Sequence, residues 1–222
     1  MRLTWIGQSG YVLKSQGTEI IIDPYLSDIV NKVANRPRLV EAPINPAEIK
    51  ADAVVCTHDH LDHLDPETVA EMPKGTHFIT TNEGKAHFAK LGIETAEVLN
   101  VGESVTVGNV KLTAVFAEHS CEAFGLIVEA EGKRFYFSSD TLYNEELFKI
   151  AEYKPDYTFI CINGKLGNMN VEEAVITAKK IGAKVNVPTH YGMFASNTED
   201  PKKFTDNIEG GLELQFNVEY DI

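Results

Sequence analysis

The chain has 222 residues, of which 43% are hydrophobic and 24% charged, values that are ordinary for a globular protein and exclude a disordered or fibrous chain. With 33 acidic and 20 basic residues the net charge is −13, which disfavours nucleic acid as a ligand, and no apolar run reaches the roughly 18 residues of a membrane helix. The N-terminal residues form no long apolar run that ends in small residues, so we expect no signal peptide and a cytoplasmic protein.

Three scattered cysteines indicate neither a disulfide framework nor a zinc ribbon. Cys56 and Cys161 lie in apolar runs and are expected to be buried, whereas Cys121 follows a histidine and its role stays open. No internal repeat and no low-complexity linker divides the sequence. We therefore expect a single domain over residues 1–222.

The first half of the chain predicts short strands, a long loop and then strands alternating with helices. Gln16-Gly17 is a good hairpin turn, and residues 23–46, with four prolines and no clear period, are expected to form a loop. Asp65 is a good N-cap for a short helix, and Gly92 closes another. The predicted elements are strands 2–6, 11–14, 19–22, 53–57 and 76–80 and helices 66–72 and 82–91.

The second half repeats this order, with a strand meander followed by helix–strand units. Its predicted elements are strands 104–107, 110–117, 124–129, 134–137, 157–162, 185–187 and 212–218 and helices 144–153, 171–181 and 201–208. A meander followed by helix–strand units, twice over, is typical of an α/β fold in which two sheets pack face to face with helices outside. The predicted architecture is a four-layer αββα sandwich.

The strongest chemical signal is the pattern HxHxDH at residues 58–63, directly after a predicted buried strand. Histidines two residues apart, His58 and His60, can face one cation, and Asp62 and His63 can then face a second. Imidazole and carboxylate ligands suit zinc, manganese or iron. The alternative is a polar surface turn, but these side chains would desolvate and repel one another unless positive charge lay between them.

Three more residues follow apolar strands and could complete two metal sites: His119, Asp140 and His190. Alone, either histidine could be an ordinary hydrogen-bonded side chain, and Asp140 could form an Asx turn or a helix cap. Beside the HxHxDH turn they predict a metal site made of His58, His60, Asp62, His63, His119, Asp140 and His190. His77, in a strand, and His87, in a helix, have no other ligand type beside them in the sequence and are expected to be structural.

In this order the motifs resemble those of the metallo-β-lactamase superfamily. The matching residues are Asp23 in Ile21-Ile22-Asp23-Pro24, the turn at 58–63, His119, Asp140 in Ser139-Asp140-Thr141 and His190 in Pro188-Thr189-His190-Tyr191-Gly192. A closer resemblance, to the L-ascorbate-6-phosphate lactonases and related small metal-dependent hydrolases, is carried by Trp5-Ile6-Gly7-Gln8-Ser9-Gly10-Tyr11, Thr57-His58-Asp59-His60 and Pro188-Thr189-His190. The chain is shorter than these lactonases, and Ser139 stands where many relatives have glycine, so the resemblance leaves the substrate open.

The resemblance implies two divalent metal ions. His58, His60 and His119 would bind one, and Asp62, His63 and His190 the other, with Asp140 between them. Asp23 would be an outer carboxylate that orients a ligand. The superfamily favours zinc and the lactonases manganese, while iron and nickel stay open.

The expected function is a hydrolase that activates water against a small ester or lactone, including a sugar-phosphate lactone. Asp59, Asp62 and Asp140 are the expected catalytic residues, with Asp59 carrying a proton to the leaving group or, alternatively, forming a solvated turn carboxylate. Candidates for orienting the substrate or binding its phosphate are Tyr191, Asn163, Lys165, Arg36 and Arg38.

A phosphodiesterase, a glyoxalase II-like thioesterase and a non-catalytic metal-binding or scaffold protein are the alternatives. The expected partner is a small-molecule substrate rather than nucleic acid or a membrane. A homo-oligomer is compatible with the sequence.

Overall fold

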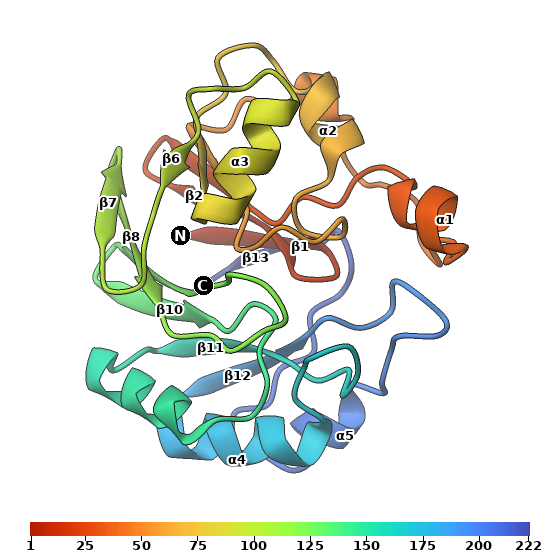
Figure 1. Cartoon of the computed structure of the whole chain (residues 1–222). Helices are drawn as coiled ribbons and strands as arrows, with labels where there is room; N and C mark the ends of the chain where they lie inside the picture. Colours follow the sequence, from red (N-terminus) through yellow and green to blue (C-terminus); the bar gives the residue numbers. More distant parts are fainter.

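The computed structural model describes all residues, Met1–Ile222, and contains two β-sheets packed face to face with helices on both outer faces (Figure 1). The predicted four-layer α/β sandwich is therefore confirmed. None of the helices combines the length and the hydropathy that crossing a membrane requires.

The first sheet has seven strands in the order β13-β1-β2-β3-β4-β5-β6. An antiparallel meander of β1 to β3 is extended on one side by parallel strands and on the other by the C-terminal strand, which pairs antiparallel with β1. The strands are β1 (Arg2–Gly7), β2 (Gly10–Ser15), β3 (Thr18–Ile22), β4 (Ala53–Val55), β5 (Phe78–Thr80), β6 (Glu97–Val98) and β13 (Glu219–Asp221).

The second sheet has six strands in the order β12-β11-β10-β9-β8-β7. Strands β7 to β10 form an antiparallel meander, and β10, β11 and β12 run parallel. Their bounds are β7 (Ser104–Val107), β8 (Val110–Val115), β9 (Gly125–Ala130), β10 (Lys133–Phe137), β11 (Tyr157–Cys161) and β12 (Val185–Thr189).

Helices α2 and α3 lie over the first sheet, and η2, α4 and α5 lie over the second (Figure 1). The helical segments are α1 (Ile29–Ala34), η1 (Pro46–Glu48), α2 (Pro66–Glu71), α3 (Asn82–Lys90), η2 (Glu145–Tyr153), α4 (Val171–Ile181) and α5 (Lys202–Thr205), of which η1 and η2 are 3₁₀ helices. Helix α4 begins with a capping box at Asn170 and Glu173 and ends at Gly182 in the left-handed conformation.

Alternating side chains of the central strands serve two separate cores. Ile20, Ile22 and Val55 belong to a cluster of 39 buried residues that fills the space between the sheets and extends under α4. Their neighbours Ile21 and Val54 point the other way, into a cluster of 13 residues beneath α2 and α3. This two-sided burial makes both sheets a firm support for the loops that leave them.

Several strand ends turn sharply. Gln8, Asp23, Ser139 and His190 follow β1, β3, β10 and β12 within two residues, and all four have a positive φ between 44° and 62°. Non-glycine residues adopt this conformation at an energetic cost that tertiary contacts must offset, and such positions cluster at functional sites. These four residues therefore indicate where a functional site lies.

The predicted strand 212–218 is wrong, because the last strand, β13, begins at Glu219. The alternation of Leu212, Leu214 and Phe216 does reflect burial, since all three pack on the main core. The segment nevertheless forms no ladder of its own, and Asn217, with φ of 56°, turns the chain before β13.

Other elements differ in extent or type. The predicted loop 23–46 contains the short helix α1, and the predicted helix 144–153 is a 3₁₀ run, η2, that buries Leu147 and Ile150 as its pattern indicated. The final helix is shortened to α5, and the two-residue strand β6 was not predicted.

Candidate metal centre

The HxHxDH turn is held between β4 and α2. The amides of His63 and Leu64 both donate to the carbonyl of His60, at 3.0 and 2.8 Å, and close the turn. Asp65 then caps α2 by accepting from the amides of Glu67 and Thr68. A rigid strand on one side and a capped helix on the other hold the imidazoles in place.

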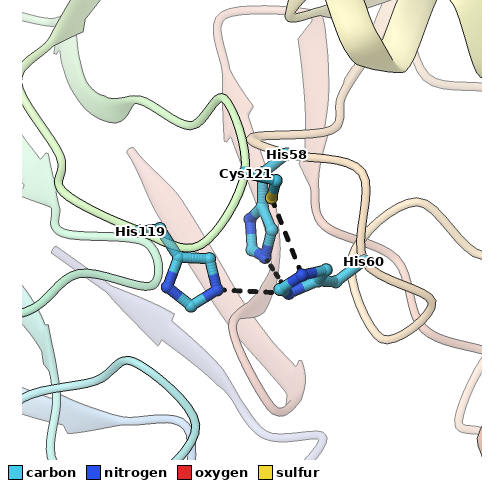
Figure 2. A group of neighbouring side chains, drawn as sticks. All are labelled: His58, His60, His119 and Cys121. Atoms are coloured by element: carbon cyan, nitrogen blue, oxygen red, sulfur yellow. Dashed lines mark hydrogen bonds between the residues drawn. The ribbon is translucent and has the colours of Figure 1, made fainter.

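The first cluster consists of His58, His60 and His119, whose rings face one another (Figure 2). His60 Nδ1 lies 3.1 Å from His58 Nε2 and 3.1 Å from His119 Nε2. His119 Nδ1 donates to the carbonyl of Gly167 at 3.1 Å, so its proton is on Nδ1 and the lone pair of Nε2 faces the cluster. Three converging nitrogen lone pairs are suited to bind a divalent cation.

The second cluster consists of Asp62, His63 and His190, and Asp140 lies between the two clusters. Asp140 Oδ1 is 3.3 Å from His63 Nε2, and its Oδ2 is 3.2 Å from His190 Nε2 and 3.9 Å from His119 Nε2. Asp62 Oδ2 is 3.6 Å from His190 Nε2. The structure thus brings together all seven predicted metal ligands, which come from four separate segments of the chain.

Asp23 lies behind His63 and is fully buried. Its Oδ2 accepts from His63 Nδ1 at 2.8 Å and from the Thr57 hydroxyl at 2.7 Å, and its Oδ1 accepts from the Thr57 amide at 2.7 Å. A carboxylate on the outer nitrogen fixes the orientation of the imidazole and turns Nε2 towards the cluster.

Burial and mutual charge strongly perturb these groups. Burial lowers the pKa of His58 well below its ordinary value. Burial also opposes charge on His63 and His190, but the neighbouring carboxylates, Asp140 foremost, raise the pKa of His63 well above its usual range and that of His190 to about 9. The same imidazoles hold the pKa values of Asp62 and Asp140 below the usual range, although burial alone would raise them.

The donor set fits divalent cations. His63 Nε2 and Asp140 Oδ1 are buried, and their closest ionic contact is that of 3.3 Å between them. Buried polar atoms satisfied so poorly are costly unless a further partner binds them. Two groups of imidazole and carboxylate ligands that share one carboxylate are typical of a dinuclear site.

Three residues at the centre were not predicted as part of it. Asn168 donates from Nδ2 to Asp140 Oδ2 at 2.9 Å and to Asn163 Oδ1 at 3.0 Å, and the amide of Gln8 contacts Asp62 and His190. An asparagine in a loop carries no sequence signal for such a role. Gln8 does stand in a segment that resembles a family motif.

The third is Cys121, which lies beside His60. Its sulfur is 3.7 Å from Nε2 of that ring, whereas the other two histidines meet Nδ1 (Figure 2). The thiol therefore contacts the outer nitrogen of His60. Cys56 and Cys161 are buried as expected.

His77 and His87 belong to neither cluster, but in space each has a carboxylate beside it. His87 Nδ1 donates to Asp59 Oδ1 at 2.5 Å, so the predicted catalytic residue Asp59 is oriented by a helix α3 side chain at the edge of the centre. His77, which directly precedes β5 and is partly buried, pairs with Glu97 in β6 at 2.7 Å. The partners are 28 and 20 residues apart in the sequence, so the sequence alone did not indicate either pair.

The predicted phosphate-binding role of Arg38 does not fit its contacts. Its guanidinium donates to the carbonyls of Tyr25, Ser27 and Val40 and covers the Tyr25 ring, so it holds the loop 25–40 together. Arg36 is half-buried, and Lys165 is exposed and donates to the Ser196 carbonyl at 3.2 Å.

The two remaining orienting candidates are also engaged in the fold. Tyr191 packs against Trp5 with ring centroids 4.9 Å apart and the rings tilted by 33°. Asn163 connects Asn168 to Asn197 in a buried chain of amides.

A family model described as a beta-lactamase superfamily domain matches residues 18–191. Among relatives, a metal-dependent hydrolase from Methanopyrus kandleri is 28% identical over 99% of this chain and 95% of its own length. One from Rubrobacter xylanophilus is 30% identical over 98% of this chain and 93% of its own. The names of these relatives specify no substrate.

Two solved structures share the fold. A metallo hydrolase from Ignicoccus hospitalis has a TM-score of 0.80 at 24% identity and covers 100% of this chain and 98% of its own. An isothiocyanate hydrolase from Delia radicum gut bacteria has a TM-score of 0.83 at 21% identity, with 100% and 99% covered.

Proposed function

The chain belongs to the beta-lactamase superfamily, and on this premise we propose that it is a metal-dependent hydrolase with a dinuclear centre that cleaves a small ester or lactone. The observation that carries the proposal is the convergence of the two clusters on Asp140, whose Oδ2 lies 3.2 Å from His190 of the second cluster and 3.9 Å from His119 of the first. No packing requirement explains so many buried imidazoles and carboxylates at one point.

The chain supplies the parts that such a reaction needs. When bound, a pair of divalent cations polarises a carbonyl group and lowers the pKa of water towards neutrality. His58, His60 and His119 would hold one cation, Asp62, His63 and His190 the other, and Asp140 would contact both. Asp23 and the Gly167 carbonyl keep His63 and His119 in orientation.

Asp59 is the proposed proton carrier to the leaving oxygen. It stands between two ligands in sequence, yet its carboxylate turns to His87 and not into either cluster, and it stays partly exposed. Exposure gives it access to a substrate, and the hydrogen bond from His87 holds it in one position.

An uncharged carbonyl substrate is favoured by the electrostatics. The net charge is −13, and Arg38, the most buried of the candidate cations, is committed to backbone carbonyls. The other candidates to bind a phosphodiester are Arg36, which is half-buried, and Lys165, which donates to the Ser196 carbonyl. A sugar-phosphate lactone stays compatible if Lys165 turns to its phosphate group.

The test combines metal analysis with a substrate panel. The purified protein is assayed for bound zinc, manganese, iron and nickel, and then for hydrolysis of lactones, simple esters, a chromogenic phosphodiester and an acyl-glutathione. We expect about two metal ions per chain and the fastest turnover with a lactone or ester.

His60→Ala and Asp140→Ala should each abolish hydrolysis and lower the metal content, while His77→Ala, a histidine paired outside the centre, should leave both unchanged. Full activity in His60→Ala would contradict the proposed centre. Faster turnover of the phosphodiester or the thioester would contradict the proposed substrate class.

A further inference from the structure

Gln8 is the least exposed polar residue of the segment Trp5 to Tyr11, and the proposed function gives it no role. It follows β1 directly, has φ of 50°, and its side chain is fully buried. Glutamine is seldom buried completely, and it adopts a left-handed backbone only at a cost. Both features require an explanation.

The backbone of Gln8 is locked against β12. Its carbonyl accepts hydrogen bonds from Trp5 Nε1 at 2.9 Å, from Thr189 Oγ1 at 2.9 Å and from the amide of His190 at 3.2 Å. Three donors on one carbonyl leave the residue little freedom. The direction of its side chain is therefore set by the same strand end that carries His190.

That side chain points at the second cluster. Gln8 Nε2 lies 2.8 Å from Asp62 Oδ2 and 3.3 Å from His190 Nε2, the two atoms that face each other across 3.6 Å. The other end of the amide, Oε1, is buried and has no hydrogen-bond partner. An orphaned carbonyl oxygen beside two metal-ligand atoms is costly in the protein alone.

With a cation bound, we expect the oxygen end of the Gln8 amide, and not its NH₂ end, to face Asp62 and His190. The lone pair of His190 Nε2 and the oxygen of Asp62 would be committed to the cation, and an NH₂ group directed at it would be repelled. Because the two ends of an amide have nearly the same shape, a rotation about the last side-chain bond exchanges them without disturbing the packing. Amide oxygen is a ligand that divalent cations accept.

On the premise of the two-cation site proposed above, we propose that Gln8 is a further metal-binding residue, whose amide oxygen binds the cation held by Asp62, His63 and His190. The side-chain contacts of Gln8 are with Asp62 and His190 of the second cluster and not with the first cluster. Gln8 therefore strengthens one of the two binding events and leaves the other unchanged.

The test is a calorimetric titration of the metal-free protein with Zn²⁺, repeated with a competing chelator. Gln8→Met keeps the length of the side chain and removes the oxygen, and it should weaken one binding event about tenfold or more with the other unaltered. Gln8→Glu supplies a charged oxygen at the same place and should bind that cation at least as tightly as glutamine does.

Gln16→Met is the matched control. Gln16 has a similar positive φ, 44°, in the turn after β2, and it is exposed. Its replacement should alter neither binding event. Thermal melts of the metal-free variants check that each has folded.

The Gln8→Glu variant distinguishes a metal-binding role of Gln8 from a role as hydrogen-bond donor to Asp62. It does so even if Gln8→Met fails to fold. If Gln8 only donates to Asp62, a carboxylate at position 8 repels Asp62 and weakens the binding of the cation. That result would overturn the inference. Equal affinities in Gln8→Met and the wild type also overturn it and leave the proposed function intact. A wild-type protein that binds fewer than two cations overturns both.

Discussion

At the residue scale, the pair of Asp59 and His87 separates catalysis from metal binding. The Asp59 carboxylate turns to His87 and not into a cluster, yet Asp59 stands between His58 and His60 in the chain. We expect His87→Ala to lower kcat about tenfold to a hundredfold, because Asp59 then loses the hydrogen bond that orients it for proton transfer. Metal content and KM should stay close to the wild-type values.

His77→Ala is the matched control for this prediction, since His77 also pairs with a carboxylate, that of Glu97, but outside the metal centre. Steady-state kinetics and metal analysis of both variants provide the measurement. An unaltered kcat in His87→Ala means that Asp59 is a solvated turn carboxylate, the alternative left open by the sequence.

Asn168 acts on the metal centre through Asp140. Its amide donates to one oxygen of that carboxylate at 2.9 Å and is itself 5% exposed. Asn168→Ala should weaken metal binding about tenfold, since the carboxylate between the clusters loses its outer partner. It should also lower the free energy of unfolding by about 1–3 kcal/mol, because Asn163 Oδ1 loses its donor.

Chelator competition and chemical denaturation measure the two effects of Asn168→Ala. Asn207→Ala, at an exposed asparagine that donates only to the Lys203 carbonyl, is the control and should change neither quantity. Wild-type metal affinity in Asn168→Ala would show that Asp140 is held by its imidazole neighbours alone.

At the scale of the elements, Asp65 joins the turn, helix α2 and the loop after β3. Besides capping α2, its Oδ2 accepts from the amide of Ser27 at 2.9 Å and from the hydroxyl of Thr68 at 2.6 Å. We expect Asp65→Ala to destabilise the protein by about 2–4 kcal/mol, more than an ordinary cap, because several buried donors lose their acceptor together.

Asn144→Ala is the comparison for Asp65→Ala, because Asn144 caps η2 at the surface through a single amide, that of Glu146. Its loss should cost about 1 kcal/mol. Denaturant unfolding of both variants gives the two values, and equal losses would mean that the contacts of Asp65 to the loop contribute nothing.

The elements also show where sequence patterns are reliable. Strands β3 and β7 and helix α4 were predicted to within one residue, because apolar periodicity and turn or cap residues agree there. The strand predicted over 212–218 failed because burial of alternate side chains does not require a ladder partner. Strand β6 was missed because two residues carry no period, and it exists only because β5 offers a free edge.

At the scale of the whole molecule, the buried charges couple stability to pH. In the metal-free protein burial favours neutral His190, but Asp140 and Asp62 prevail and raise its pKa to about 9. A histidine whose pKa is raised above the unfolded value of about 6.5 stabilises the fold fully below that pH, and the stabilisation is lost as the pH rises through about 9.

We therefore expect the free energy of unfolding of the chelator-treated protein to fall between about pH 7 and about pH 9.5. The fall should be smaller in His190→Gln, and it should vanish when metal is bound, since a cation then replaces the proton. Denaturant titrations across this range measure it. Identical pH profiles for the metal-free wild type and His190→Gln would contradict the prediction.

The sequence by itself determined the fold class, the turn at residues 58–63 and the set of seven ligand candidates, because periodicity and the dense HxHxDH pattern are local properties of the chain. Only the tertiary structure decided which side chains support them: Gln8 beside Asp62, Asn168 beside Asp140, His87 beside Asp59 and Arg38 within its own loop. These contacts join residues from 13 to 54 positions apart, and they form because strand ends from both sheets meet at one edge. The residue types alone do not indicate which strand ends lie together.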